Sequence, residues 1–250
     1  MTNPTLKTLL DHRSVRKFTN QKLTTAEVTT LIRAAQHAAT STFSQQYSII
    51  SVTDPTKLAA LGAISGHHWL EQAGHYFVFV ADQYRNQQLA PNNATTTANL
   101  HSTDKLLAGI FDATLATEAV VTAGESLGLG STIMGSILND VPRVIDLLDL
   151  PELTFPVLGL AIGHPAETPE QKPRLPQELM HFTNGYHRVT AADPQLVAYD
   201  QLIQAYYQQR TSHQREETFS HHIVTELGRD PQQRAGILVG LHQQGFLQTN

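Results

Sequence analysis

The seven residues His12–Phe18 (HRSVRKF) concentrate groups that can bind an anion. They hold a histidine, a serine and the cations Arg13, Arg16 and Lys17, in a chain whose net charge is −5. Cations gathered against the overall sign of a protein are typical of a phosphate site. A solvated basic turn after the first helix is equally compatible with the spacing. The rest of the chain must show whether there is a ligand for this segment.

Two further basic groups could share that ligand. Lys172 and Arg174 lie in a proline-rich segment (KPRLP), and Arg210 and Arg215 follow a helical stretch. Each pair alone is more typical of a solvated surface. Lys172 and Arg174, however, share a feature with the segment His12–Phe18, because in both places the cations stand beside proline or serine in a loop. We therefore predict that one phosphate is held from two distant places in the chain.

Several other chemistries lack support in the sequence. The chain has no cysteine and no Gly-x-Ser-x-Gly motif for a nucleophile. The adjacent pairs His67–His68 and His221–His222 point apart in a helix and cannot easily share a metal ion. Glu118 and Glu125, on one helix face, are expected to be solvated or capping. A chain with cation-rich and glycine-rich loops, but without its own nucleophile or metal site, is expected to use a bound organic cofactor.

The glycine run 128–135 (GLGSTIMG) suggests a dinucleotide-binding fingerprint but does not match it. Ile133 stands where the third glycine is needed, and a helix precedes the run where the fingerprint needs a strand. We therefore reject a Rossmann site. The glycines are assigned instead to close approach of the backbone to a flat ligand or to another chain.

Composition sets the broad class of protein. A chain of 250 residues with 40% hydrophobic and 16% charged residues can form one large domain, or a domain with an extension. An isoelectric point near 6.2 argues against general binding to nucleic acid or anionic membranes. The N-terminal apolar run is too short for a signal peptide, and there is no run of about eighteen apolar residues. We expect a soluble, cytoplasmic protein.

Hydrophobic periodicity predicts the elements that position these residues. Helices are expected over 5–10, from a capping box at Thr24 to residue 38, over 104–127, after Asp140, from 196, and twice in the tail from Ser212. The helix over 104–127 should be largely buried and should end at Gly128. Apolar strands are expected over 47–52, 76–81 and 155–162, and a surface loop over 87–99. This pattern gives an α+β or mixed α/β sandwich with a helical C-terminal extension.

Three motifs in order, HRSVRKF (12–18), ESLGLG (125–130) and KPRLP (172–176), resemble those of nitroreductase-family flavoenzymes, in particular the NADPH-dependent branch of oxygen-insensitive nitroreductases and flavin reductases. The resemblance covers nearly the whole chain. It implies an α+β sandwich with a central antiparallel-type sheet flanked by helices. It also implies a single nitroreductase-like domain over 1–250, with an FMN-binding core over 1–163 and an extended loop plus helical arm over 164–250. An intertwined homodimer with one FMN per subunit is expected.

The resemblance also assigns roles to residues around the FMN. His12, Ser14, Lys172 and Arg174 should hold its phosphate, with Arg13 beside them. Arg16 should face the pyrimidine side of the ring, where a cation stabilises the negative charge of the reduced flavin. The stretch Ile133, Met134, Gly135 and Ser136 should run along the ring near N5 and O4. No protein side chain is expected to be catalytic, because N5 of the flavin carries the chemistry.

The substrate side of the site is implied less completely. Thr40, Ser41 and Phe43 match a serine-rich loop at the ring and substrate pocket. His67 stands where the family often has Gln, and Ile133 and Ser136 replace an aromatic and a glycine of relatives. Arg210 and Arg215 match basic residues that recognise the 2′-phosphate of NADPH in relatives. The pair favours NADPH over NADH as donor.

The expected function is therefore an NADPH-dependent FMN oxidoreductase. NADPH would reduce the flavin, NADP⁺ would leave, and an acceptor such as a nitroaromatic, a quinone or free flavin would take two electrons in the same pocket. A non-catalytic flavin- or nucleotide-binding module is the alternative. A third class, an anion or nucleic-acid binder, is disfavoured by the isoelectric point near 6.2.

Overall fold

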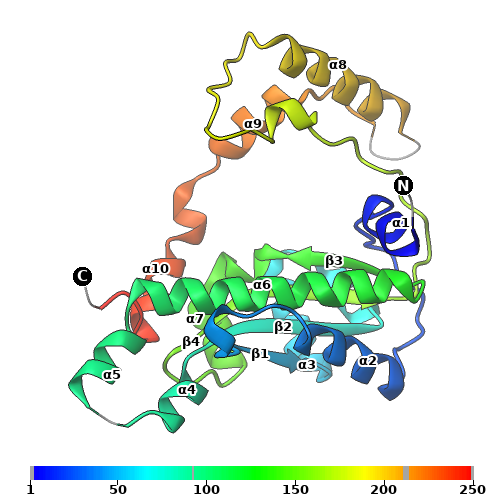
Figure 1. Cartoon of the computed structure of the whole chain (residues 1–250). Coiled ribbons are helices and arrows are strands. Elements are labelled where there is room, and N and C mark those ends of the chain that lie inside the picture. The colour runs from blue at the N-terminus through cyan, green and yellow to red at the C-terminus, as the bar shows by residue number, and fades with distance from the viewer. Residues whose placement is uncertain (1–2, 92, 211–213, 249–250) are drawn as a thin grey trace. The chain divides into compact units, whose positions relative to one another are not determined.

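The computed structural model describes residues 3–91, 93–210 and 214–248 (Figure 1). Asn92 and Ser212, which fall in the expected loop and at the expected start of the tail, lie outside them. The elements in chain order are α1 (Pro4–Leu10), α2 (Thr25–Gln36), η1 (Ser41–Phe43), β1 (Tyr47–Ser51), α3 (Pro55–Ser65), η2 (His68–Gln72), β2 (His75–Asp82), α4 (Tyr84–Leu89), α5 (Ala94–Leu100), α6 (Thr103–Ser126), β3 (Gly130–Met134), η3 (Gly135–Asp140), α7 (Val141–Leu147), β4 (Thr154–Gly163), η4 (Gln177–Leu179), α8 (Pro194–Gln209), α9 (Phe219–Leu227), η5 (Pro231–Arg234) and α10 (Gly236–Gln243).

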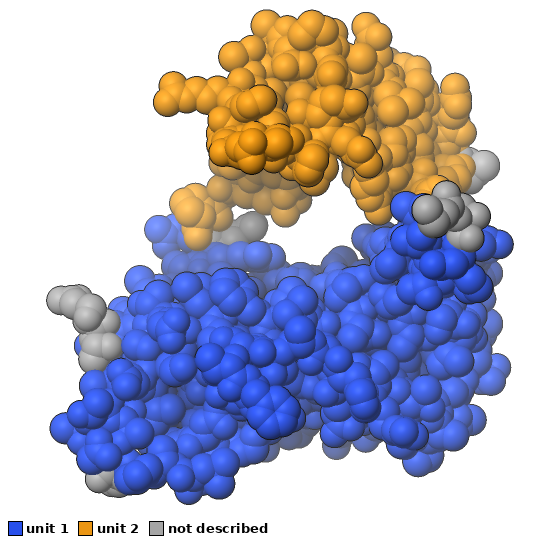
Figure 2. Space-filling view, viewed as in Figure 1, with its two compact units in different colours: residues 1–169, 232–250 blue, residues 170–231 orange. Residues whose placement is uncertain are grey.

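The chain divides into two compact units, coloured separately in Figure 2. Unit 1 comprises residues 1–169 and 232–250, and unit 2 comprises residues 170–231. Unit 1 contains the whole sheet and the segment His12–Phe18, whereas unit 2 contains α8 and α9. Residues 232–250, with α10, belong to unit 1 although they follow unit 2 in the chain.

The described residues form a four-stranded sheet in the order β1-β2-β4-β3, and every pair is antiparallel. The predicted antiparallel sheet flanked by helices is therefore confirmed. A β-bulge between Phe79 and Val80 brings Val80 opposite Pro156 of β4. Proline lacks the N–H that a regular ladder position needs, and a bulge accommodates it.

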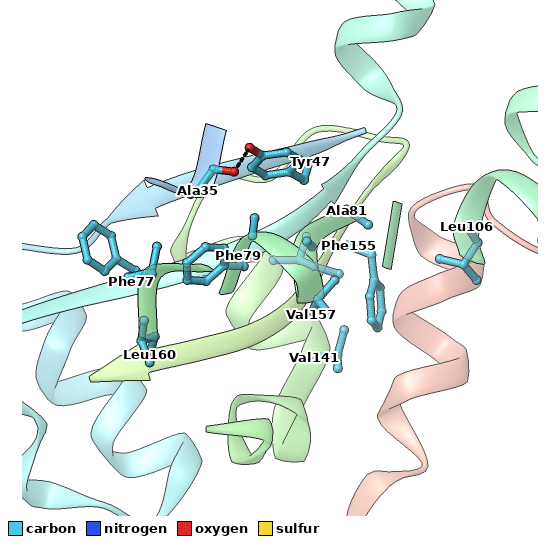
Figure 3. Packing of buried hydrophobic residues seen from close by; sticks show 14 of the residues in the cluster. Ala35, Tyr47, Phe77, Phe79, Ala81, Leu106, Val141, Phe155, Val157 and Leu160 are labelled. Carbon is cyan, nitrogen blue, oxygen red and sulfur yellow. Dashed lines mark hydrogen bonds between the residues drawn. The ribbon is translucent and has the colours of Figure 1, made fainter. Parts of the chain in front are cut away.

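Both faces of the sheet are covered by helices, as the continuously apolar sequence of β2 predicts. Alternate residues of a strand point to opposite faces. Phe77 and Phe79 pack on the side of α2 and α6, whereas Tyr76 and Val78 pack on the side of α3, η3 and α7. Figure 3 shows the first cluster, in which the hydroxyl of Tyr47 donates to the carbonyl of Ala35 at 2.9 Å.

Three of the predicted helix ends are confirmed, whereas the helix expected to reach residue 38 ends at Gln36. The Thr24 hydroxyl accepts from the backbone N–H of Glu27, and the Glu27 carboxylate accepts from the N–H of Thr24, which completes the capping box. Asp140 caps α7 through the N–H of Arg143. Gly128, with a φ of 78°, follows the end of α6 in the left-handed conformation.

Three expectations about the elements are wrong. Residues 87–99, predicted as a loop, include the end of α4 and most of α5, because Asn93 caps α5 by accepting from the N–H of Thr96. The glycine-rich run contains strand β3, which the sequence did not indicate. The helix over 104–127 is not largely buried throughout, because Leu107, Phe111 and Leu115 form an exposed apolar stripe.

The same helix is long and apolar enough to cross a membrane by composition alone. In this fold, however, half of that apolar window is buried. Its inner face packs against α2 and the sheet in the main core cluster (Figure 1). α6 is therefore the central core helix of unit 1.

Candidate functional site

The segment His12–Phe18 is an extended strip attached to the edge of the sheet. Ser14 forms a parallel bridge with Ser131 of β3, and the N–H of Val15 donates to the carbonyl of Ser131 at 2.8 Å. The side chains of Val15 and Phe18 are buried below it. A Cβ at Gly130 would lie only 2.5 Å from a methyl group of Val15, so this approach requires glycine. The cations therefore sit on an ordered segment.

His12 is held by a carboxylate of α6. Its Nδ1 lies 2.6 Å from Oε1 of Glu125, and the Glu125 side chain is largely buried. The expectation that Glu125 is merely solvated or capping is wrong. Because the carboxylate can only accept, Nδ1 carries a proton and the ring orientation is fixed.

The other cations of the segment have weaker partners. Arg13 donates to the carbonyl of Asp11 at 2.9 Å. Lys17 pairs with Glu167 at 2.8 Å, in an exposed ion pair. Arg13 also borders a hollow of about 270 Å³, but the carboxylates of Asp11, Glu125 and Glu167 line it too. This hollow is therefore not the expected anion site.

Arg16 and His67 come together in unit 1. Arg16 is exposed and follows directly after Val15, whose carbonyl accepts from the hydroxyl of Thr132. Burial, and then the charge of Arg16, lower the pKa of His67 from the ordinary 6.5. His67 also contacts the ring of Trp69, with centroids 5.6 Å apart. A neutral imidazole offers one donor and one acceptor, as the amide of Gln does.

The stretch Ile133–Ser136 leaves room for a flat group. Met134 is buried, but Ile133 is 41% exposed at the end of β3. Outside its own stretch of chain, no described atom lies within 4 Å of the position that a Cβ would take on Gly135. The carbonyl of Gly135 accepts from the guanidinium of Arg234 at 3.3 Å. The backbone at Gly135 is thus both open on one side and anchored.

The loop around Thr40, Ser41 and Phe43 is strained and is held by a buried carboxylate. Thr42, Phe43 and Gln45 have positive φ angles of 51°, 58° and 47°, a conformation unfavourable for side chains with a Cβ. Asp112 of α6 accepts from the N–H of Ser41 at 2.7 Å and from that of Gln46 at 2.9 Å.

The Phe43 side chain is 84% exposed and borders a hollow of about 640 Å³ that also contains Arg85 and Asn86. Buried Asp112 thus positions the loop predicted to face a substrate.

In unit 2, the residues of α8 fix the proline-rich segment. The hydroxyl of Tyr199 donates to the carbonyl of Pro173 at 3.1 Å. The ammonium of Lys172 lies 5.5 Å from the ring centroid of Tyr207. Arg174 donates to the carbonyl of Lys172 at 2.7 Å. Tyr199 and Tyr207, about two helical turns apart on α8, therefore hold the segment that carries Lys172 and Arg174.

Arg210 and Arg215 gather at the same aromatic ring. The guanidinium of Arg215 lies 4.0 Å from the ring centroid of Tyr207, and that of Arg210 lies 5.9 Å from it. Each arginine also faces a carboxylate, Arg210 that of Glu170 at 3.6 Å and Arg215 that of Glu217 at 3.3 Å. Unit 2 thus brings the two predicted NADPH-binding arginines and the predicted FMN-binding Lys172 to one ring.

Four positioning residues were missed from the sequence: Asp112, Glu125, Tyr207 and Arg234. Asp112 carried a signal, because a carboxylate flanked by apolar residues in the middle of a long helix needs hydrogen-bond donors when it is buried. Arg234 and Tyr207 carried no such signal.

Among the residues that the structure describes, no group of three or more histidine, aspartate or glutamate side chains could hold a metal ion.

Comparisons with known proteins identify the family. The Nitroreductase family matches residues 9–164, and its C-terminal domain matches residues 172–249. FMN reductase (NADPH) of Bacillus subtilis (strain 168) is 41% identical over 233 residues, covering 92% of this chain and 93% of that protein. The chain belongs to the nitroreductase family, as its motifs predicted.

Solved structures agree with this assignment. The NfrA1 nitroreductase from B. subtilis has a TM-score of 0.88 and 39% identity, covering 97% of this chain and 98% of that one. NADPH:FMN oxidoreductase from Vibrio harveyi, complexed with NAD⁺, has a TM-score of 0.87 and 32% identity, covering 98% and 100%. The expected nitroreductase-like sandwich with a helical C-terminal part is confirmed.

The residues present fit FMN, the cofactor expected for this family. In unit 1, the open face at Gly135 and exposed Ile133 would accept a planar ring, and Arg16 would supply a cation beside the imidazole of His67. The residues of unit 1 that would hold the phosphate are His12, which Glu125 orients, and Ser14. The remaining phosphate residues predicted from the sequence, Lys172 and Arg174, belong to unit 2.

Proposed function

We propose that this chain is an NADPH-dependent FMN oxidoreductase that passes two electrons to small-molecule acceptors such as nitroaromatics, quinones or free flavin. The named relatives support the donor and the cofactor. The observation that carries the proposal is the cationic strip fixed to β3, which presents Arg16 next to His67 with its lowered pKa. An exposed cation fixed at that place can attract an anionic group.

Each side chain has a distinct task in this proposal. Bound FMN supplies a two-electron carrier between NADPH and the acceptor. His12, Ser14, Lys172 and Arg174 hold the phosphate, and Arg13 lies beside them. Arg16 stabilises negative charge on the pyrimidine side of the ring.

The remaining residues shape the ring and nucleotide sites. Residues 133–136 and Thr40–Ser41 line the ring, with His67 as a hydrogen-bonding neutral side chain. Phe43 borders the acceptor pocket, and Arg210 and Arg215 bind the 2′-phosphate of NADPH. NADPH and the acceptor use one pocket in turn.

We further propose that the chain acts as a homodimer in the cytoplasm, where NADPH is available. The support is the exposed stripe of Leu107, Phe111 and Leu115, which lie one helical turn apart on the outer face of α6. A contiguous apolar face of this kind is typical of a surface that another chain covers.

The test is an anaerobic titration of the purified protein with NADPH and with NADH. The visible absorbance band of bound flavin should bleach with one equivalent of NADPH. Replacing Arg210 and Arg215 together with Ala should raise the KM for NADPH much more than that for NADH. A yellow protein that NADPH does not bleach, and that turns over no acceptor, would be the non-catalytic module instead.

A further inference from the structure

Three cations surround one tyrosine ring in unit 2. The distances from the ring centroid of Tyr207 are 4.0 Å for Arg215, 5.5 Å for Lys172 and 5.9 Å for Arg210. Three like charges grouped around one ring repel one another. The negative face of an aromatic ring attracts cations within about 6 Å and offsets part of that repulsion. Tyr207, together with the carboxylates of Glu170 and Glu217, therefore stabilises this concentration of positive charge.

The ring is itself fixed in place. Tyr207 is 4% exposed and packs with Tyr199 and Ile203 along one face of α8. The ring of Tyr206 meets it edge-on, with centroids 5.2 Å apart. A buried ring on a helix face gives the flexible cations around it a fixed reference point.

Arg215 is restrained on two sides. Its guanidinium carbon lies over the ring of Tyr207, 4.0 Å from the ring centroid, and its Nε is 3.3 Å from the carboxylate of Glu217. The guanidinium is planar and delocalised, so a ring contact on one side and a carboxylate at Nε together restrict the direction of its remaining N–H donors. Such preorganisation favours a bidentate partner such as a phosphate.

We propose that the ring of Tyr207 is a specificity-determining positioning residue, which orients Arg215 toward the 2′-phosphate and so sets the preference for NADPH over NADH. This inference rests on the proposed role of Arg210 and Arg215. It assigns the selectivity to the π-face of a buried ring, and not to the tyrosine hydroxyl.

The experiment compares Tyr207→Phe, Tyr207→Leu and a trifluorinated phenylalanine introduced at position 207. The readout is the ratio of kcat/KM for NADPH to that for NADH, with FMN saturating and one acceptor throughout. Phe keeps the ring face and should keep the ratio within about twofold. Leu should lower the ratio about tenfold through the KM for NADPH. The fluorinated ring keeps the shape of Phe but loses its negative face, and should behave like Leu.

Matched controls separate this role from a structural one. Tyr186→Leu removes an exposed ring from the same unit and should leave both kcat/KM values unchanged. If Tyr207→Leu does not fold, the Phe and fluorinated pair still decides, because the two rings have the same shape. Equal ratios for that pair, or a loss of NADH activity in parallel with NADPH, would overturn the inference.

Arg215→Ala distinguishes the proposed role of Arg215 in binding the 2′-phosphate from the proposed role of Tyr207 in orienting Arg215. If it lowers the NADPH to NADH ratio while the ring variants do not, the proposed role of Arg215 stands and that of Tyr207 fails. If Arg215→Ala leaves the ratio unchanged, both fail.

Discussion

Replacing Asp112 should release the loop over 41–46. The carboxylate is 1% exposed and accepts from two backbone N–H groups, at 2.7 and 2.9 Å. A hydrogen bond to a charged group contributes about 1.5–3 kcal/mol net. In Asp112→Asn one acceptor oxygen remains, but the amide nitrogen faces the second N–H, which is left without a partner. We expect a loss of about 2–4 kcal/mol in the free energy of unfolding.

The same substitution should also affect turnover. The loop contains three residues with positive φ, and this backbone conformation costs about 1–2 kcal/mol for each of them. The loop should therefore relax to a less strained conformation once the carboxylate is replaced. Because this loop is proposed to line the ring and the acceptor pocket, the KM for the acceptor should rise. Stability is measured by urea unfolding of the FMN-saturated protein at fixed concentration, since binding and oligomerisation shift the apparent value.

The matched control is Asp104→Asn on the same helix. The Asp104 side chain is 83% exposed and pairs only loosely with Lys105, at 3.6 Å. Its replacement should change the free energy of unfolding by less than about 1 kcal/mol. If Asp112→Asn and Asp104→Asn gave equal urea midpoints and unchanged acceptor KM values, the loop would not depend on the buried carboxylate.

Four other outcomes can be measured on the same protein. Gly130→Ala places a Cβ 2.5 Å from Val15, and should lower the free energy of unfolding by about 1–3 kcal/mol in urea. Burial and then Lys22 lower the pKa of His75 from 6.5. Near and below pH 6.5 the unfolded state therefore binds more protons than the folded state, and the free energy of unfolding falls on acidification. His75→Gln should reduce the dependence of this free energy on pH by up to about 1.4 kcal/mol per pH unit. Phe111→Glu should yield monomers in light scattering; unchanged mass would exclude this stripe from the interface. Arg16→Leu should lower the midpoint potential of bound FMN by about 20–40 mV, measured spectroelectrochemically.

Local sequence predicted the elements whose hydrophobic pattern is strong. β2 and β4 are continuous apolar runs, and α2 carries its own capping box. By contrast, β3 (GSTIM) has only two apolar residues in five, and it forms a strand because β4 and the segment around Val15 lie on either side of it. Those partners are far away in the chain, so a local pattern does not reveal them.

The candidate site shows the same division. Residue type and motif order indicated His12, Arg16 and Lys172, because cations at fixed spacing are visible in a sequence. The carboxylates that position the site segments could not be recognised from the sequence as their hydrogen-bond partners. Glu125 meets His12 across 113 residues, and Asp112 meets Ser41 across 71. A carboxylate on a helix has the same local sequence whether it faces water or a buried donor, and only the fold decides between them.

One helix links the two ends of the proposed cofactor site. Asp112 and Glu125 both belong to α6, and their separation in the chain corresponds to about 20 Å along the helix axis. Asp112 fixes the loop assigned to the ring and acceptor, whereas Glu125 fixes the histidine assigned to the phosphate. Because α6 is packed against the sheet over most of its length, it holds these two distant contacts in a constant relation. Two carboxylates of this apolar helix, Asp112 and Glu125, therefore face segments of the proposed site, whereas the exposed apolar stripe lies on the outer face of the helix.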